Sequence, residues 1–511
     1  MATHETLLIL DFGGQYTQLI ARRVRELGVF SEIHRGEMPA GEMRRLSPIG
    51  VVLSGGPASI YEAGAIQPDP GVFGLGVPVL GLCYGQQAMA HLLGGKVEPS
   101  GSREYGAAEL EADLACPLFA GTKAVQRVWM SHGDRVERLP DGFRVIGHTA
   151  NAPVAAMADE ARRLYGIQFH PEVRHTELGR QILDNFLSMC KARRDWTPAS
   201  IRREAVSRIR DRVPEGRIIV GLSGGVDSSV TALLCREAVG GRTVPIFVDT
   251  GLLRLDEGDS VQRRFEGFGL KVDRVNAADR FLARLAGVDD PEEKRRRIGH
   301  EFIAVFEEEA RRFPDARFLA QGTLYPDVIE STSVRGPSAT IKTHHNVGGL
   351  PERLGLELIE PLRELFKDEV RRIGEELGLP PEFVWRHPFP GPGLAVRILG
   401  DVTPERVLLL QCADAIFMEE IGAAGLYREI AQAATVLLPV RSVGVMGDQR
   451  TYENVAALRA VTTEDFMTAD WYRFPPEVLD RVARRIVNEV RGINRVVYDV
   501  TSKPPGTIEW E

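Results

Sequence analysis

The chain has 511 residues, of which 43% are hydrophobic and 26% are charged, as in an ordinary globular protein. This composition excludes a mainly disordered, collagen-like or coiled-coil chain, and the length suggests about three domains. The net charge of −8 disfavours a nucleic-acid partner, because binding the phosphate backbone requires a basic surface.

The cysteine content indicates the compartment. The five cysteines are an odd number, and no CxxC pair occurs. This usage disfavours a disulfide framework and a cysteine zinc site, and it favours a reducing compartment. The apolar run Leu7–Leu10 is too short for a signal peptide, and no apolar stretch approaches the ~20 residues of a membrane span. We therefore expect a cytoplasmic protein with no membrane partner.

The first predicted domain covers residues 1–195. Its short apolar runs each end in glycine or a polar turn, as in LLILDFGG, GVVLSGGP, VPVLGLCYG and YGIQFHPE. Buried parallel strands have this pattern, and an open α/β sheet places its active site at the ends of those strands. Apolar residues at helical spacing predict a helix over 176–193, and RRDWTPAS after it is typical of a linker.

The rest of the chain is predicted to form two further domains. Residues 196–385 alternate helical segments with strands expected at 217–222, 243–250, 270–277 and 316–321. This alternation predicts a second open, mainly parallel α/β sheet. The segment HPFPGPGL carries three prolines and two glycines, which can continue neither a helix nor a central strand. Longer helices after it predict a smaller α+β domain over 386–511, in a multidomain α/β protein.

One cysteine lies in a turn between a predicted strand and a predicted helix. The strand leads into Gly-Leu-Cys-Tyr-Gly at 81–85, and QQAMAHLL follows as a helix. Flanking glycines permit a tight turn that exposes a nucleophile, and a helix N-terminus lowers the pKa of a thiol. The pattern therefore predicts Cys83 as a nucleophile, and a buried structural cysteine is the alternative.

A thiolate nucleophile needs a base and an oxyanion hole. His170 follows a predicted strand, and Glu172 is placed to orient and stabilise it as the third member of a triad. A structural histidine is the alternative, and the HPEVRH spacing does not match the HExxH pattern of zinc enzymes. Gly55 and Gly56, with the backbone N–H of Tyr84, are candidates for the oxyanion hole, while a plain turn explains the two glycines equally well.

These motifs resemble the class I glutamine amidotransferases over nearly all of residues 1–190. The resemblance implies that glutamine is hydrolysed to glutamate and ammonia through a γ-glutamyl thioester on Cys83.

A serine- and glycine-rich turn follows the predicted strand at 217–222. Its residues are Ser223, Gly224, Gly225, Val226, Asp227, Ser228 and Ser229. Backbone N–H groups of such a turn at a helix N-terminus bind anions, and Asp227 suits a phosphate site only as a ligand of bridging Mg²⁺. A capped helix after a turn is the alternative. The loop lacks the G-K-[ST] ending of a Walker A motif and resembles the SGGxDS loop of the N-type ATP pyrophosphatases, which implies cleavage of ATP to AMP and pyrophosphate.

A later polar segment is typical of a mobile loop. IKTHHNVGG at 341–349 is cationic and suits a lid over an anionic reaction centre, with Lys342, His344 and His345 as its candidate residues. The paired histidines lack a third ligand at metal spacing. Taken alone, the segment is explained equally well as an ordinary loop.

Together the motifs resemble the family of glutamine-hydrolysing GMP synthases over essentially the whole chain, from LILDFGGQ to KPPGTIEWE. The resemblance implies that ATP adenylylates xanthosine monophosphate (XMP) and that ammonia from glutamine then displaces AMP to give GMP. It also implies XMP-binding positions at Arg295, Lys503, Ile508 and Glu509, Mg²⁺ bound with ATP, and a homodimer formed through residues 386–511.

Three other interpretations fit less well. Glutamine-dependent NAD synthetases use a nitrilase-like glutaminase in which the catalytic cysteine has a different setting. The GLCYG turn and the KPPGTIEWE tail of this chain therefore argue against membership of that family. An asparagine synthetase would need a catalytic cysteine directly after Met1, where the chain has alanine. A non-catalytic nucleotide-binding regulator is expected to have lost Cys83, His170 or Asp227, and all three are present.

Overall fold

The structure is a computed structural model that describes residues 4–332, 354–446, 449–463, 466 and 468–511. The chain forms two compact units, Met1–Ser200 and Ile201–Glu511. The predicted multidomain α/β class is confirmed, whereas the predicted boundary between residues 385 and 386 falls inside the second unit and stays a prediction. Among the residues that the structure describes, no helix has the length and apolar character needed to span a membrane.

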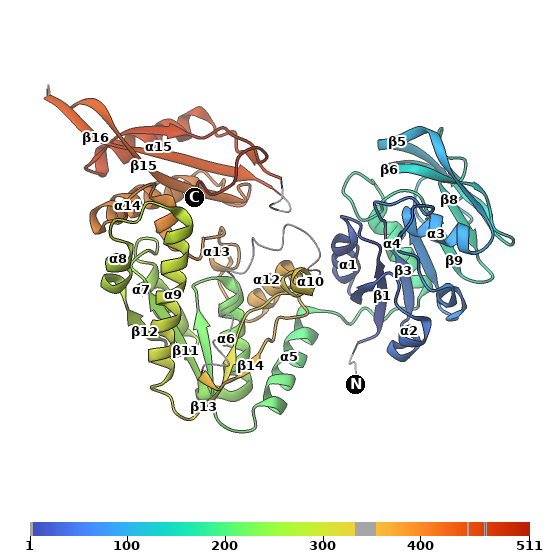
Figure 1. The fold of residues 1–511 in the computed structure, drawn as a ribbon, viewed down its shortest axis with the longest axis horizontal. Coiled ribbons are helices and arrows are strands. Elements are labelled where there is room, and N and C mark those ends of the chain that lie inside the picture. Colours follow the sequence, from blue (N-terminus) through green and yellow to red (C-terminus); the bar gives the residue numbers. More distant parts are fainter. Residues whose placement is uncertain (1–3, 333–353, 447–448, 464–465, 467) are drawn as a thin grey trace. The chain divides into compact units, whose positions relative to one another are not determined.

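A nine-stranded sheet in the order β2-β1-β3-β4-β9-β8-β7-β5-β6 forms the centre of the first unit (Figure 1). Its parallel part contains the glycine-ended runs of the sequence, whose strands are almost fully buried, as expected for an α/β core. The parallel strands are β1 (Thr6–Asp11), β2 (Phe30–Arg35), β3 (Gly50–Leu53), β4 (Val79–Leu82) and β9 (Leu164–Ile167).

Four antiparallel strands extend this sheet, and we did not predict them. In β6 buried and exposed residues alternate for much of its length, so the strand shows no apolar run. The antiparallel strands are β5 (Lys96–Ala112), β6 (Val125–Arg138), β7 (Arg144–His148) and β8 (Ala156–Asp159).

The helices of the first unit include the predicted one near its end, which is shorter than 176–193. The α-helices are α1 (Thr17–Glu26), α2 (Ala40–Leu46), α3 (Tyr84–Leu92) and α4 (Gly179–Met189), and 3-10 turns occur at Pro70–Gly74 and Pro117–Phe119.

The second unit contains a five-stranded parallel sheet in the order β12-β11-β10-β13-β14. All four predicted strands are present, β12 is shorter than predicted, and β14 was not predicted. The strands are β10 (Arg217–Leu222), β11 (Thr243–Asp249), β12 (Asp273–Asn276), β13 (Ala316–Ala320) and β14 (Glu357–Ile359).

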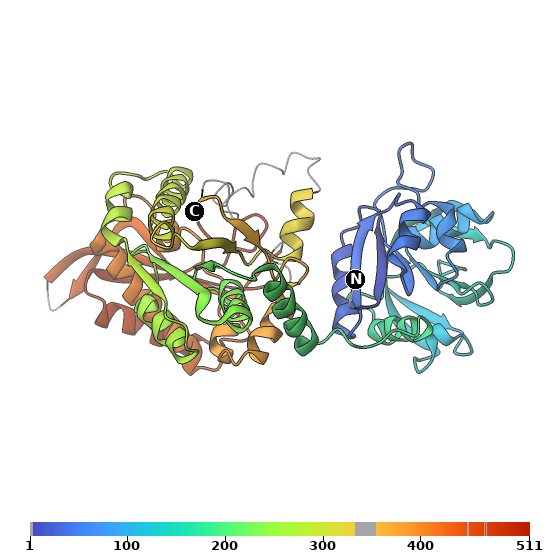
Figure 2. The same ribbon diagram turned by 90° about the horizontal axis from the view of Figure 1, so that it is seen from below.

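Helices cover both faces of this sheet (Figures 1 and 2). They are α5 (Pro198–Arg212), α6 (Val226–Val239), α7 (Glu257–Gly267), α8 (Ala278–Leu285), α9 (Pro291–Ala310), α10 (Tyr325–Thr332), α12 (Lys367–Glu376) and α13 (Pro381–Val384), with a 3-10 turn at Gly240–Arg242.

In the C-terminal part of the second unit, two helices pack with a four-stranded sheet, in agreement with the predicted α+β fold of this region. Strand β18 pairs in parallel with β16, while β15 and β17 pair with β16 in the antiparallel sense. The elements are α14 (Pro404–Ala423), β15 (Gln432–Met446), β16 (Gln449–Thr462), β17 (Asp470–Trp471), α15 (Pro476–Glu489) and β18 (Ile493–Tyr498).

The two longest helices of this unit, α9 and α14, begin in the same way. The side chain of Asp290 accepts a hydrogen bond from the Glu293 N–H, and Thr403 accepts one from the Arg406 N–H. A proline follows each cap, where its missing N–H costs nothing. Caps of this kind stabilise a helix by about 0.5–2 kcal/mol, and they explain why both helices start where they do.

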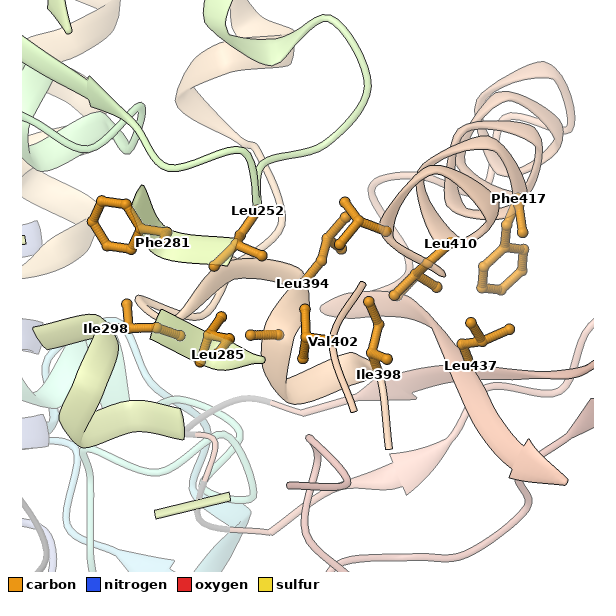
Figure 3. Packing of buried hydrophobic residues seen from close by; sticks show 14 of the residues in the cluster. Leu252, Phe281, Leu285, Ile298, Leu394, Ile398, Val402, Leu410, Phe417 and Leu437 are labelled. Carbon is orange, nitrogen blue, oxygen red and sulfur yellow. The ribbon is translucent and has the colours of Figure 1, made fainter. Parts of the chain in front are cut away.

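One continuous apolar core joins the five-stranded sheet to the C-terminal part of the unit (Figure 3). Leu394 lies within the 3-10 turn Gly393–Arg397 and Ile398 directly follows it, and both lie between side chains of the two parts. The Leu394 N–H donates to the Leu252 carbonyl at 2.7 Å. Gly393 has φ +66, and a Cβ there would lie 2.4 Å from the Leu252 carbonyl oxygen. The close approach therefore requires glycine at this position of the HPFPGPGL segment.

Candidate active sites

The turn between β4 and α3 holds Cys83 in a strained backbone conformation. Cys83 has φ 51 and ψ −106, a region that costs a non-glycine residue about 1–3 kcal/mol. The glycines on either side permit the sharp turn. A Cβ on Gly81 would lie 2.6 Å from the carbonyl carbon of Gly85, and one on Gly85 would lie 2.3 Å from the Leu53 carbonyl oxygen. This backbone has the features of a nucleophile elbow, at the N-terminus of α3.

His170 and Glu172 form a buried pair beyond the end of β9. The distance from His170 Nδ1 to Glu172 Oε1 is 2.7 Å, and their side chains are 6% and 0% exposed. The backbone N–H of His170 donates to the Trp129 carbonyl at 3.0 Å. The Thr176 hydroxyl donates to the His170 carbonyl at 2.6 Å, and Arg23 Nε donates to the Glu172 carbonyl at 3.1 Å. These bonds hold the imidazole in one orientation.

The charge balance of the site favours a protonated histidine beside the sulfur. Burial opposes protonation, but the Glu172 carboxylate and the Cys83 sulfur outweigh it, so the pKa of His170 lies well above its usual range. Because Nδ1 is held by Glu172, the ring offers Nε2 to the sulfur. A Cβ on Gly55 would lie 3.2 Å from His170 Cε1 and 3.8 Å from Cys83 Cβ, so both side chains meet over this glycine. An imidazolium there stabilises the thiolate.

The predicted oxyanion-hole residues surround the same space. Within the described part of the chain, no acceptor takes a hydrogen bond from the N–H groups of Gly55, Gly56 or Tyr84. A Cβ on Gly56 would lie 2.9 Å from the Phe12 carbonyl oxygen, so only glycine fits this turn. Three unpaired backbone donors near a buried nucleophile can stabilise a developing oxyanion.

Three residues near Cys83 were not predicted. Gln168 Nε2 lies 3.5 Å from Cys83 Sγ, and Gln87 Nε2 donates to Gln168 Oε1 at 3.2 Å. Cys83 Sγ lies 3.5 Å from the Ser131 carbonyl oxygen. A signal for Gln168 was present, because it lies in the same YGIQFHPE segment as His170, two residues before it. Ser131 lies on β6, whose alternating residues gave no signal.

The serine- and glycine-rich loop connects β10 to α6 as predicted. Gly224 has φ +74, and Gly225 is the N-cap residue of α6. The Ser223 N–H donates to Ser228 Oγ at 3.2 Å, and the Ser229 hydroxyl donates to the Gly225 carbonyl at 2.8 Å. These internal bonds hold the loop in one conformation at the N-terminus of α6, where the helix dipole favours anions.

Asp227 lies in the first turn of α6 and faces a cation that we did not predict. Lys367 Nζ forms an ion pair with Asp227 Oδ2, although 140 residues separate them in the sequence. Asp227 Oδ1 is buried and has no hydrogen-bond partner. In the described ranges, no group of three His, Cys, Asp or Glu side chains could hold a metal. One carboxylate with a free oxygen still fits Mg²⁺, which takes one or two carboxylates while phosphates and waters complete its shell.

The HPFPGPGL segment connects this loop to the C-terminal tail. Arg386 Nη1 donates to the Gly224 carbonyl at 3.2 Å. Three guanidinium groups surround the ring of Phe389, with their carbons 5.1 Å (Arg254), 5.8 Å (Arg386) and 5.0 Å (Arg397) from its centroid. One aromatic ring is therefore packed against arginines that contact the loop, α14 and the tail.

Three arginines, of which Arg397 and Arg459 are buried, fix the shape of the tail. Arg397, which is fully buried, binds the Glu509 carboxylate through Nε and Nη2 at 3.0 and 2.7 Å. Arg459 Nε donates to the Ile508 carbonyl at 2.8 Å, and Arg295 Nη2 donates to the Glu511 carbonyl at 2.6 Å. These contacts bring three of the predicted XMP-binding residues to one region, while Lys503 has a different partner and donates to the Phe466 carbonyl at 2.6 Å. The predicted lid residues Lys342, His344 and His345 lie outside the described residues.

Three family models match successive parts of the chain. The model described as glutamine amidotransferase class-I matches residues 8–190. The model described as NAD synthase matches residues 202–251, which include the loop after β10. The model described as GMP synthase C terminal domain matches residues 419–510.

Curated relatives match along the whole length. A GMP synthase [glutamine-hydrolyzing] from Phenylobacterium zucineum is 60% identical over 516 residues, which cover 100% of this chain and 99% of the relative. Proteins of the same name from Nitratidesulfovibrio vulgaris and Heliobacterium modesticaldum are 54% and 56% identical. These matches cover 100% of this chain and 100% of the first protein, and 99% of each chain for the second.

Proposed function

The chain belongs to the family of glutamine-hydrolysing GMP synthases, and from this membership we propose how its own residues divide the reaction. The enzyme is a ligase that aminates XMP to GMP with nitrogen from glutamine. It cleaves ATP to AMP and pyrophosphate through an adenylyl-XMP intermediate. The observation that carries the assignment of roles is the Cys83 elbow with the His170–Glu172 pair beside it.

The first unit performs the glutaminase reaction. The Cys83 thiolate attacks the side-chain amide carbon of glutamine, and the oxyanion is stabilised by the N–H groups of Gly55, Gly56 and Tyr84. His170 gives its proton to the departing ammonia, which leaves a γ-glutamyl thioester. The neutral imidazole then takes a proton from water, whose attack on the thioester releases glutamate. Glu172 keeps the imidazole oriented and stabilises its charged form.

The second unit performs the adenylylation. Ser223, Gly224, Gly225, Val226, Asp227, Ser228 and Ser229 are proposed to hold the β- and γ-phosphates of ATP. The XMP oxygen at position 2 attacks the α-phosphorus, and pyrophosphate leaves. Lys367 places a positive charge beside this loop through its ion pair with Asp227. Ammonia then attacks the activated carbon, and AMP departs.

Asp227 is proposed as the protein ligand of Mg²⁺. Its buried Oδ1 without a partner is the support for this role. When bound with ATP, Mg²⁺ supplies positive charge that stabilises the departing pyrophosphate. Lys367 would then neutralise the second oxygen of the carboxylate and keep it oriented toward the phosphates.

Arg295 on α9 and three residues of the C-terminal tail, Lys503, Ile508 and Glu509, are proposed to bind XMP. The carboxylate of Glu509 is bound by Arg397, which holds the tail in shape at this position. Arg295 and Lys503 provide the cations suited to the phosphate of XMP. The lid role of Lys342, His344 and His345 rests on the family resemblance and the cationic sequence.

A second copy of the chain is the proposed partner of the C-terminal sheet. Val443 and Val445 lie two residues apart on β15 and are 50% and 72% exposed, and Tyr452, directly opposite Val443 on β16, is 58% exposed. Side chains two residues apart share one face of a strand. An apolar face of this kind supports a homodimer. The five cysteines are free, which supports the proposed cytoplasmic location.

Product analysis tests this function. Protein supplied with glutamine, XMP, ATP and Mg²⁺ is expected to form GMP, glutamate, AMP and pyrophosphate in equal amounts. Omission of XMP should abolish the release of pyrophosphate. ADP and inorganic phosphate in place of AMP and pyrophosphate would contradict the role of the 223–229 loop.

A further inference from the structure

A second buried histidine lies beside the Cys83 site and has no role in the mechanism above. His132 is on β6, and its side chain is 1% exposed. The carbonyl oxygen of its neighbour in the sequence, Ser131, lies 3.5 Å from Cys83 Sγ. Whatever fixes His132 therefore also fixes the stretch of backbone that lines the nucleophile.

The pairing of β5 with β6 is interrupted at this position. Pro99 pairs with Asp134 and Glu104 pairs with His132, so four residues of β5, 100–103, lie opposite the single Gly133. Such an irregularity disrupts the ladder of backbone hydrogen bonds and bends the strand that contains it. Glu104–His132 is the first regular pair after the interruption. Ser131 pairs with Tyr105 directly after it, so the residue that contacts Cys83 lies beside the end of a regular stretch of the ladder.

Buried side chains add to the backbone pairing at the end of this regular stretch. Glu104 Oε2 lies 3.3 Å from His132 Nε2, and the Thr149 hydroxyl donates to Glu104 Oε1 at 3.2 Å. On its other side the His132 ring contacts the Asp134 carbonyl through Nδ1 at 3.0 Å. Glu104, His132 and Thr149 are all buried. Buried networks of this kind are rigid when every member is satisfied.

The hydrogen-bond partners determine how many protons the pair holds. The Asp134 carbonyl only accepts, so His132 Nδ1 carries a proton. The contact between His132 Nε2 and Glu104 then needs one shared proton, carried by either group. Burial lowers the pKa of His132, and the charge of His170 acts in the same direction, while Glu104 opposes both. The pair is uncharged overall whichever group holds the proton, so its influence on the thiolate is through position.

We propose that Glu104 and His132 are positioning residues of the glutaminase site. They hold β6 so that the Ser131 carbonyl and the adjoining backbone line the space in which glutamine meets Cys83. Neither residue touches the reacting atoms. The proposal rests on the proposed glutaminase function, and the assays below separate failure of the one from failure of the other.

The first test is the Glu104→Ala variant, assayed with glutamine and with ammonium chloride as nitrogen source. The change leaves His132 Nε2 and the Thr149 hydroxyl without their partner, and we expect kcat/KM for glutamine to fall by about 10- to 100-fold, mainly through KM. Synthesis from ammonia should be unchanged, because it needs only the second unit. Glu104→Gln should restore most of the activity, since its amide donates to neutral His132 and its carbonyl accepts from Thr149. Glu109→Ala, an exposed position on the same strand, is the matched control.

A second measurement distinguishes a positioning role from a role in charge. Alkylation of Cys83 by iodoacetamide is followed against pH by mass spectrometry of the Cys83 peptide. Because the pair is uncharged overall, the midpoint of this titration should be the same in Glu104→Ala and in the unaltered protein. A midpoint displaced by about one unit or more would overturn the positioning role.

The remaining outcomes are equally decisive. An unchanged KM for glutamine in a folded Glu104→Ala protein would overturn the proposal. Where that variant does not fold, Thr149→Val removes only the hydroxyl, and the proposal then requires a loss of about 3- to 10-fold in kcat/KM for glutamine. If the unaltered protein made GMP from ammonia and none from glutamine, the glutaminase function itself would be wrong.

Discussion

The two candidate sites differ in how much of each is in place before substrate arrives. Around Cys83 the nucleophile, base, orienting carboxylate and unpaired N–H groups all come from the first unit and are buried. Around Asp227 the chain supplies a loop, one carboxylate with a free oxygen, and a lysine. In the first site the protein therefore supplies all the reacting and stabilising groups except the substrate, whereas in the second site the bound substrates supply part of them.

This difference follows from the chemistry. Thioester formation needs a thiolate and a proton donor in fixed geometry, and only protein groups can provide them. In phosphoryl chemistry the reacting groups belong to the substrates, and the protein mainly stabilises the negative charge on them. A single substitution in the first site should therefore affect one route to GMP, whereas one in the second site should affect every route.

The largest expected effect comes from Asp227→Asn. GMP formation should fall by at least about 100-fold with glutamine and with ammonium chloride alike, because adenylylation precedes attack by ammonia on either route. Steady-state rates of GMP formation from both nitrogen sources measure the loss. Glu237→Gln removes a carboxylate from the same helix far from the loop and is the control. Normal synthesis of GMP from ammonia in Asp227→Asn would show that Asp227 is not needed for adenylylation and would contradict its assigned role.

A smaller effect, confined to one route, is expected for Glu172→Gln. The amide keeps a hydrogen bond to His170 but loses the charge that raises the pKa of the imidazole. Synthesis from glutamine should fall about 10- to 100-fold, because the imidazolium that protonates the departing ammonia is then less stable. Rates are compared with those of Glu177→Gln, an exposed carboxylate nearby. Equal losses on both routes would show that the sites are not independent.

The smallest expected effect needs no mutation. It is a difference between the two sites in how the rate of GMP synthesis depends on pH. The raised pKa of His170 means that the imidazolium is present up to that pKa and is lost as pH rises through it. Synthesis from glutamine should therefore decline at alkaline pH. Synthesis from ammonium chloride should rise over the same range, because a larger fraction is nucleophilic ammonia. Parallel pH profiles for the two routes would contradict the assigned role of His170.

The sequence predicts the parts of the fold that are encoded locally. The strands β1, β3, β4, β9 and β10 are buried on both faces and are visible as apolar runs. The Cys83 elbow and the 223–229 loop are continuous segments, so their residues follow from spacing alone. The antiparallel strand β6 alternates buried and exposed residues and gives only a weak signal, whereas β8 is buried but consists of AMAD, which contains no run of large apolar side chains.

Contacts between distant residues could not be predicted in this way. Lys367 meets Asp227 from 140 positions away, and Glu104 meets His132 across an irregular strand pair. Nothing in the sequence around Lys367 or Glu104 distinguishes these two residues from other charged residues of the chain. Only the register of the strands and the packing of α6 against α12 bring them together.

The separation of the two sites is tested most directly by the Cys83→Ala variant, assayed for GMP with each nitrogen source. No other nucleophile is placed to form the thioester, so synthesis from glutamine should be abolished. Synthesis from ammonium chloride at alkaline pH should equal that of the unaltered protein. GMP formation from glutamine in this variant, or loss of the ammonia route in a folded protein, would contradict the account.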